Sequence, residues 1–85
     1  MTSVDWFKMW YEDKQSILNC MVRNLADDLR AGYDYYGKSA TTQRAEIEGY
    51  KAQMDYEFEY LKTLDEKKAN HWCYVDMVKR GAITP

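Results

Sequence analysis

One segment of this chain carries residue types that could bind a nucleotide phosphate. Residues 32–39 read Gly-Tyr-Asp-Tyr-Tyr-Gly-Lys-Ser and satisfy the P-loop pattern G-x-x-x-x-G-K-[ST] at every specified position. In such a loop backbone amides surround the phosphates, a lysine reaches the β- and γ-phosphates, and a hydroxyl holds magnesium. Lys38 and Ser39 would take the last two roles. A nucleotide-dependent regulator is therefore one hypothesis for this chain.

The sequence around this segment does not favour a P-loop. A P-loop needs a buried strand leading in and a helix leading out, but residues 25–31 are charged and have helical periodicity. Three tyrosines would also crowd the phosphate. Helix capping explains the same residues, with Gly32 as a C-cap, Gly37 in a turn and Ser39 near the next helix start. We prefer the capping interpretation and predict no bound cofactor.

The single histidine, His71, stands two residues before Cys73. Side chains two apart on a helix diverge, so this pair can neither share a zinc ion nor act as nucleophile and base. With Cys20 as the other cysteine, His and Cys alone provide too few ligands for a closed zinc site. Carboxylate neighbours such as Asp27 and Asp28 have no evident pocket to shift their pKa values. We therefore expect no metal site and no enzyme activity.

The same segment offers a second kind of site, a surface that binds a partner. The candidate residues are Tyr33, Asp34, Tyr35, Tyr36 and Lys38. Tyrosine rings are large and amphipathic and have few rotatable bonds, which suits them to protein recognition when a rigid support displays them. The alternative is that one or two rings fold back and cap the open end of a helical hairpin, with the hydroxyl groups in water.

Two long helices must support this segment. The first is predicted over residues 3–31, from a capping-box-like start at Thr2 to a C-cap at Gly32. We expect one helix across the polar residues 12–16, although a bend there is the alternative. Its buried face should consist of Trp6, Trp10, Ile17, Met21, Leu25 and Leu29, with Phe7, Tyr11, Leu18 and Val22 beside them.

The second helix is predicted over residues 41–66. Its core stripe should be Ile47, Tyr50, Met54, Phe58, Leu61 and Leu64. Charges of alternating sign predict a solvated salt-bridge ladder on another face, made by Glu48, Lys51, Asp55, Glu59 and Lys62.

A shorter third helix is predicted over residues 70–80, because the apolar pattern lapses from 65 to 70 and resumes at Trp72. Folded back on an antiparallel hairpin, it would give an all-α three-helix bundle with the tryptophans at one end. Residues 82–85 should then fray. If the second helix instead runs straight on, two long helices would form a dimeric bundle, in which a partner chain covers Trp72, Val75 and Val78.

Composition limits the classes of protein to consider. The chain has 85 residues, which is enough for one domain over 1–85. It is 46% hydrophobic and its net charge is -2, a composition that indicates a folded domain. Basic residues are spread along the chain, so we expect no general nucleic-acid binding. No apolar run is long enough for a signal peptide or a membrane span, which predicts a cytoplasmic protein with free thiols.

Eight tyrosines, three tryptophans and five methionines are a surplus of residues that recur at binding surfaces. The sequence therefore predicts a non-enzymatic protein–protein interaction module, of the size and composition of a small phage or mobile-element inhibitor or accessory protein such as an anti-CRISPR. The alternatives are a structural homodimer, the nucleotide-binding regulator above, and a single-strand nucleic-acid binder that stacks bases on the tyrosines.

Overall fold

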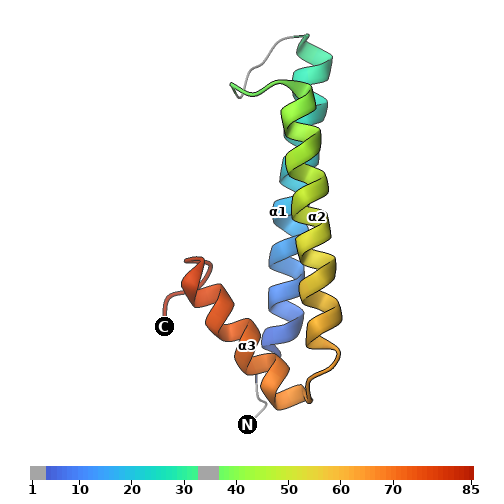
Figure 1. Cartoon of the computed structure of the whole chain (residues 1–85). Helices are drawn as coiled ribbons and strands as arrows, with labels where there is room; N and C mark the ends of the chain where they lie inside the picture. The colour runs from blue at the N-terminus through green and yellow to red at the C-terminus, as the bar shows by residue number, and fades with distance from the viewer. Residues whose placement is uncertain (1–3, 33–36) are drawn as a thin grey trace.

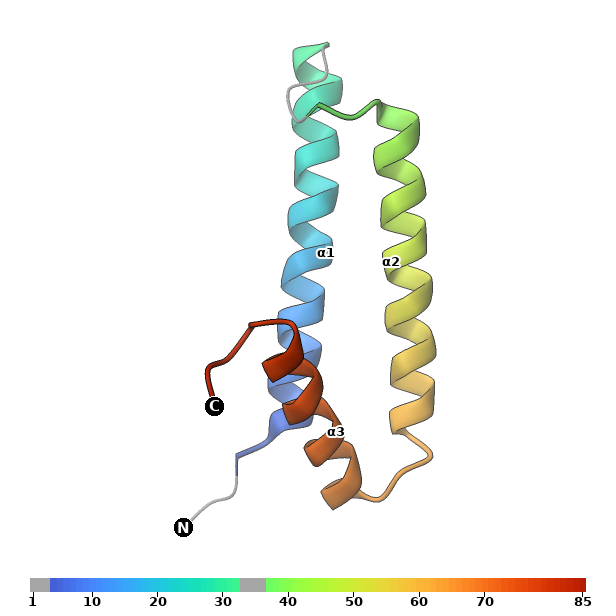
Figure 2. The ribbon, with the colours of Figure 1, turned by 60° about the vertical axis from the view of Figure 1, so that its left-hand side comes forward.

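The computed structural model describes residues 4–32 and 37–85, which form three helices: α1 (Trp6–Ala31), α2 (Ala40–Leu61) and α3 (Glu66–Lys79). Helices α1 and α2 run antiparallel as a long hairpin, and α3 folds back beside the lower part of α1 (Figures 1 and 2). The all-α prediction with a shorter third helix is confirmed. The alternative with an uninterrupted second helix is wrong, because α2 ends at Leu61. None of the helices described is long and apolar enough to cross a bilayer.

The ends of the hairpin helices are set by caps. The Asp5 carboxylate accepts a hydrogen bond of 3.0 Å from the Lys8 amide, so α1 begins at Trp6 instead of residue 3. Residues 1–3, with the predicted capping residue Thr2, lie outside the described part. Helix α1 continues through 12–16 without a break, as expected, and ends at Gly32, whose φ of 77° is left-handed.

The boundary between α2 and α3 differs from the prediction, which ended the second helix at residue 66 and began the third at residue 70. Asp65 caps α3: its carboxylate accepts a hydrogen bond of 2.8 Å from the Lys68 amide. The polar residues 66–68 thus form the first turn of α3 and are not a linker. Helix α3 ends in a Schellman motif, in which the Gly81 amide donates to the Val78 carbonyl and the Ala82 amide to the Met77 carbonyl.

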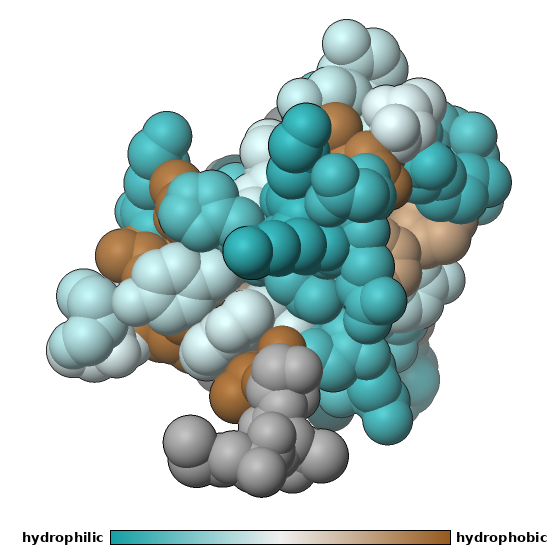
Figure 3. Space-filling view, turned by 90° about the horizontal axis from the view of Figure 1, so that it is seen from below, coloured by the Kyte–Doolittle hydropathy of each residue, from teal (hydrophilic) through white to brown (hydrophobic). Residues whose placement is uncertain are grey.

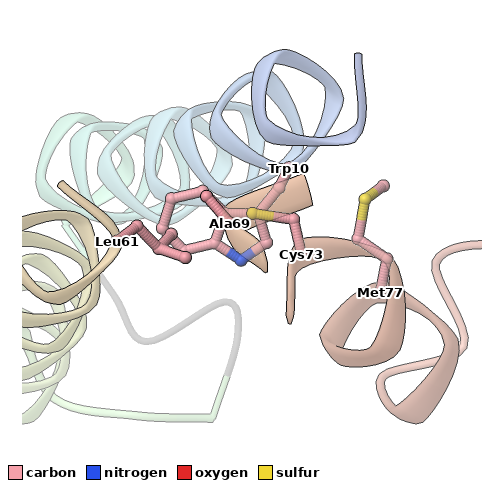
Figure 4. Packing of buried hydrophobic residues seen from close by; sticks show 5 residues of the cluster. All are labelled: Trp10, Leu61, Ala69, Cys73 and Met77. Carbon is pink, nitrogen blue, oxygen red and sulfur yellow. The ribbon is translucent and has the colours of Figure 1, made fainter. Parts of the chain in front are cut away.

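The hydrophobic core lies at one end of the hairpin, where all three helices meet (Figure 4). Its buried members are Trp10, Leu61, Ala69, Cys73 and Met77. The predicted clustering of tryptophans at this end is confirmed: the rings of Trp10 and Trp72 lie 5.8 Å apart. Ile83 also packs against the cluster, so the residues after Gly81 do not simply fray.

Away from this end the hairpin is only one layer of two helices, and the predicted broad buried face of α1 is partly exposed. Val22 and Leu29 are 47% and 52% exposed, and Ile17 is also exposed. The reason is that α3 is short. Arg80, its C-cap residue, forms an ion pair with Asp13 of α1, so α3 ends at the level of Asp13. Beyond that level nothing among the described residues covers the second side of α1.

Polar pairs replace part of the expected apolar contact between α1 and α2. The Lys14 ammonium lies 3.5 Å from the Glu57 carboxylate, with both side chains nearly buried. Farther along, the Gln43 amide donates a hydrogen bond of 2.6 Å to the buried Asp28 carboxylate. These pairs partly satisfy groups that would otherwise be costly to bury, while Oδ1 of Asp28 and the Tyr50 hydroxyl have no hydrogen-bond partner among the described residues.

The charged face predicted for α2 is exposed throughout, as expected. Of its five charged residues only Glu59 and Lys62 form an ion pair in the described part, with 3.0 Å between their charged atoms. The rest of the ladder is therefore a solvated surface of mixed charge, where such pairs contribute little to stability.

Candidate protein-binding groove

A groove between the end of α2 and one face of α3 is a predominantly apolar hollow on the described surface. It measures about 640 Å³. Its lining residues are Tyr60, Leu64, Lys67, Lys68, His71, Trp72 and Val75. Helix α3 packs on α1 and leans away from α2, and the groove lies between these two diverging helices.

The local sequence explains why these side chains share one wall. Lys68, Trp72 and Val75 stand at i, i+4 and i+7 of α3, a spacing that places them on one helix face. The turn between the helices is held by the Thr63 amide and hydroxyl, which both donate to the Tyr60 carbonyl. This turn directs Leu64 toward the core cluster at the base of the groove.

Aromatic rings connect the groove to the core. The rings of Tyr60 and Trp72 lie 6.3 Å apart in an edge-on arrangement, and Trp72 packs in turn on the buried Trp10. Edge-on aromatic pairs of this kind are favourable and hold both rings in place. Tyr60 nevertheless remains 46% exposed, so the groove has a rigid apolar wall that is open to solvent.

The charged groups at the groove are mainly cationic. Lys67 and Lys68 are both exposed at its edge. The Lys68 ammonium lies 4.0 Å from the Asp65 carboxylate, a distance at which an exposed pair is weak. Lys67 has no ion-pair partner within the described ranges. An apolar wall with one unpaired and one weakly paired lysine at its edge favours an occupant that is apolar on one side and acidic beside it.

Lys67 and His71 also line a second, wider hollow of about 870 Å³ at the same end of the molecule. Its other lining residues are Val4, Trp6, Asp65, Glu66 and Asn70. Figure 3 views this end and shows hydrophobic residues interspersed with hydrophilic ones. The second hollow carries acidic groups and is less apolar than the groove, so the groove is the better candidate for a binding site.

The titratable residues Cys73 and His71 lie in different environments. Cys73 is fully buried, and burial, with a smaller effect of the nearby Asp76 carboxylate, raises the pKa of its thiol from 9.0 to about 12. His71 is exposed in the groove while Cys73 lies in the core, so the two do not converge. Over residues 4–32 and 37–85 no three His, Cys, Asp or Glu side chains gather as metal ligands.

The ends of the P-loop match have the geometry of helix caps. Gly32 closes α1, and its amide donates to the Asp28 carbonyl. The Ser39 hydroxyl accepts a hydrogen bond of 3.1 Å from the Thr42 amide at the start of α2. The element leading into the match is α1, where a P-loop has a strand. The capping interpretation of Gly32 and Ser39 is confirmed.

The tyrosine-rich surface predicted from sequence falls mostly outside the described residues. Tyr33, Asp34, Tyr35 and Tyr36 belong to the part of the chain that the structure does not describe. Lys38 is described and exposed, and its ammonium lies 2.8 Å and 3.1 Å from the two oxygens of the Glu46 carboxylate. The end of α1 and the start of α2 lie at the opposite end of the hairpin from the groove (Figure 1).

Sequence reasoning did not identify the groove. The spacing of Lys68, Trp72 and Val75 is a usable signal, but the sequence predicts Trp72 and Val75 as buried, in the bundle or under a partner chain, and gives Lys68 no role. Whether such a stripe is buried or lines a groove depends on the angle between α2 and α3, which the residue pattern does not specify. Comparison of the chain with protein-family models, with curated proteins and with solved structures found no match.

Proposed function

We propose that this protein is a non-enzymatic protein-binding module whose groove between α2 and α3 receives an acidic amphipathic helix of a partner protein. The observation that carries the proposal is the apolar, aromatic-walled groove with Lys67 and Lys68 at its edge. This proposal moves the binding surface from the tyrosine-rich segment, where sequence alone placed it, to the groove between α2 and α3.

A helix suits the groove because its wall is itself a helix face. Trp72 and Val75 of α3 present an apolar strip with Lys68 one turn before it, and a second helix can lay its own apolar strip along these residues. Trp72 would be the anchor, since tryptophan and tyrosine supply a large share of binding energy where they are rigidly held. Because α3 is already folded and packed on α1, little ordering entropy would be lost on binding.

Charge sets the chemistry of the partner. Acidic side chains beside the apolar strip of the incoming helix would meet Lys67 and Lys68, which speeds encounter and fixes orientation. A basic helix would be repelled. The tyrosine-rich segment stays a separate prediction, tested by substituting Tyr35 and Tyr36.

The test is a titration of the ¹⁵N-labelled protein with a synthetic amphipathic helix whose apolar face carries leucines and whose flanks carry glutamates. We expect shift changes concentrated at Tyr60, Lys68, Trp72 and Val75. The double variant Lys67→Glu/Lys68→Glu should weaken binding about tenfold or more, because two attractive contacts become repulsive. A matched control is Lys8→Glu/Lys51→Glu, which makes the same change in net charge at exposed sites outside the groove.

Equal weakening by both double variants would show that the peptide responds only to net charge. Shift changes spread over α1 and the upper part of α2, with none at Trp72, would rule out the groove as the site. A peptide with the same apolar face and lysine flanks serves as the ligand control, and binding of equal strength would contradict the charge argument.

A further inference from the structure

Helix α1 carries a second, mostly apolar stripe of six residues, of which three are exposed and three are half-buried. Its members are Tyr11, Gln15, Leu18, Val22, Leu25 and Leu29, which we call the α1 seam. Successive members are four, three, four, three and four residues apart, the heptad spacing of a coiled-coil contact. Tyr11, Val22 and Leu29 are among the exposed large hydrophobic residues of the described chain.

The α1 seam lies apart from the surface that α3 covers. Each residue of a helix advances by about 100°, so Tyr11 and Leu18 point roughly 80° to 160° away from Trp10 and Asp13. Those two residues contact α3, through Asp76 and Arg80. At its lower end the seam adjoins α2, where the rings of Tyr11 and Phe58 lie 5.5 Å apart. The upper seam, around Val22 and Leu29, remains open.

The seam is symmetric about position 20. Position 11 corresponds to 29, 15 to 25, and 18 to 22. A helix with this spacing matches itself when a second copy runs antiparallel, because every seam residue then meets another seam residue. We propose that two copies of this chain associate antiparallel through the α1 seam, with the two-fold axis level with residue 20.

Charges beside the seam agree with an antiparallel arrangement. Glu12 and Arg30 are 18 residues apart, which is about five full turns, so they lie on the same edge of α1. An antiparallel copy brings Glu12 to within about two residues of the level of Arg30 in the other copy. A parallel copy would instead keep Glu12 about 27 Å along the axis from Arg30 of the other copy, so the two charges could not pair. Within its own chain Arg30 has only a 4.0 Å contact with Asp27 among the described residues.

The association needs no folding of its own. Helix α1 is already formed within the hairpin, so two copies lose mainly translational and rotational freedom and gain the burial of the exposed seam residues. The dimer would hold its two α2–α3 grooves at opposite ends, since each groove lies at the lower end of its own hairpin (Figure 1). This inference does not depend on the proposed function of the groove.

The test is the solution mass of the full chain by light scattering over a dilution series, under reducing conditions because Cys20 is exposed and could form an adventitious disulfide. We expect a dimer of about 20 kDa, twice the 10.1 kDa chain, at high concentration. Val22→Glu/Leu29→Glu should shift the midpoint of association at least tenfold toward monomer. The control Met9→Glu/Tyr56→Glu places the same charges at exposed apolar sites off the seam and should leave the midpoint unchanged.

Charge exchange tests the orientation. Glu12→Arg and Arg30→Glu should each weaken the dimer, and the double exchange should restore it, a pattern that a parallel dimer would not give. Circular dichroism of each variant verifies that the helices remain. A monomer at every concentration, or a dimer insensitive to Val22→Glu/Leu29→Glu, would overturn the proposal. Binding of the helix peptide by the groove is measured separately on Val22→Glu/Leu29→Glu. Retained binding would show that the two proposals are independent of each other.

Discussion

The indole nitrogen Nε1 of Trp10 donates a hydrogen bond of 3.0 Å to the carboxylate of Asp76, which joins the first helix to the third across 66 positions of sequence. The same carboxylate oxygen accepts a 2.8 Å hydrogen bond from Nε of Arg80, and Nη1 of Arg80 reaches Asp13 at 2.8 Å. Burial lowers the pKa of Arg80, but its hydrogen bonds to Asp76 and Asp13 outweigh this effect and raise the pKa. The three polar residues thus fix the angle of α3 on α1, and with it the width of the groove.

Replacing Asp76 should therefore loosen α3. Asp76→Ala leaves the Trp10 indole without its partner and removes the charge that faces Arg80, so we expect a loss of about 2–3 kcal/mol in the free energy of unfolding. Asp76→Asn keeps an acceptor for the indole and should cost about 1 kcal/mol. Urea unfolding followed by far-UV circular dichroism measures both. The control Asp55→Ala, at an exposed site on α2, should change stability by less than about 0.5 kcal/mol.

The ion pair between Lys14 and Glu57 gives a second prediction. Their side chains are only 8% and 11% exposed, so removing one charge leaves the other buried without a partner. Lys14→Met should cost about 3–5 kcal/mol, whereas Lys14→Met/Glu57→Leu should cost much less than the sum of the single variants. The Lys14 ammonium also lies 5.3 Å from the Tyr50 ring, a contact that the double variant loses as well. Additive single effects in urea unfolding would contradict this prediction.

The helical elements were predictable because their signals are local. Gly32 and Ser39 act through hydrogen bonds to residues three or four positions away, and such bonds can be inferred from sequence alone. The start of α3 was missed because a single cap, Asp65, outweighed the absence of apolar periodicity in the first turn. A polar first turn needs no apolar face when it lies at the end of the molecule.

The candidate site could not be predicted in the same way, because it depends on which neighbours each helix has. Periodicity identified the apolar residues of α1 correctly but not their burial: Trp10 is buried while Val22 and Leu29 are exposed. The difference arises from α3, which is too short to reach the upper hairpin. Likewise, Trp72 lines a groove only because α3 leans away from α2.

The thiol of Cys73 makes the stability of the protein depend on pH. Burial raises the pKa of this thiol from 9.0 to about 12, so between these values the unfolded chain has lost a proton that the folded chain keeps. The contribution of this thiol to the free energy of unfolding is complete below about pH 9. As pH rises toward 12 it is lost, by up to about 1.4 kcal/mol per pH unit. Urea unfolding between about pH 8 and 10.5 measures the slope, which should be shallower in Cys73→Ala and unchanged in Cys20→Ala.

Reactivity of the two thiols follows from the same difference in burial. Cys20 is exposed and Cys73 buried, so iodoacetamide should label one cysteine rapidly and the second only on unfolding. Mass spectrometry of the digested protein identifies the labelled residue. Rapid labelling of Cys73 in the native protein would mean that α3 detaches from α1 readily, which is incompatible with a rigid groove.

Two glycines should respond with opposite signs to the same substitution. Gly49 lies inside α2 with helical backbone and open space around it, so Gly49→Ala should stabilise the protein by about 0.5–1 kcal/mol through helix propensity. Gly32 has a φ of +77°, which an alanine adopts only at a cost of about 1–2 kcal/mol, so Gly32→Ala should destabilise it despite equally open space. Thermal unfolding of both variants beside the wild type measures the difference. Stabilisation by Gly32→Ala would show that α1 continues past its cap, and would remove the turn that lets α2 return along α1.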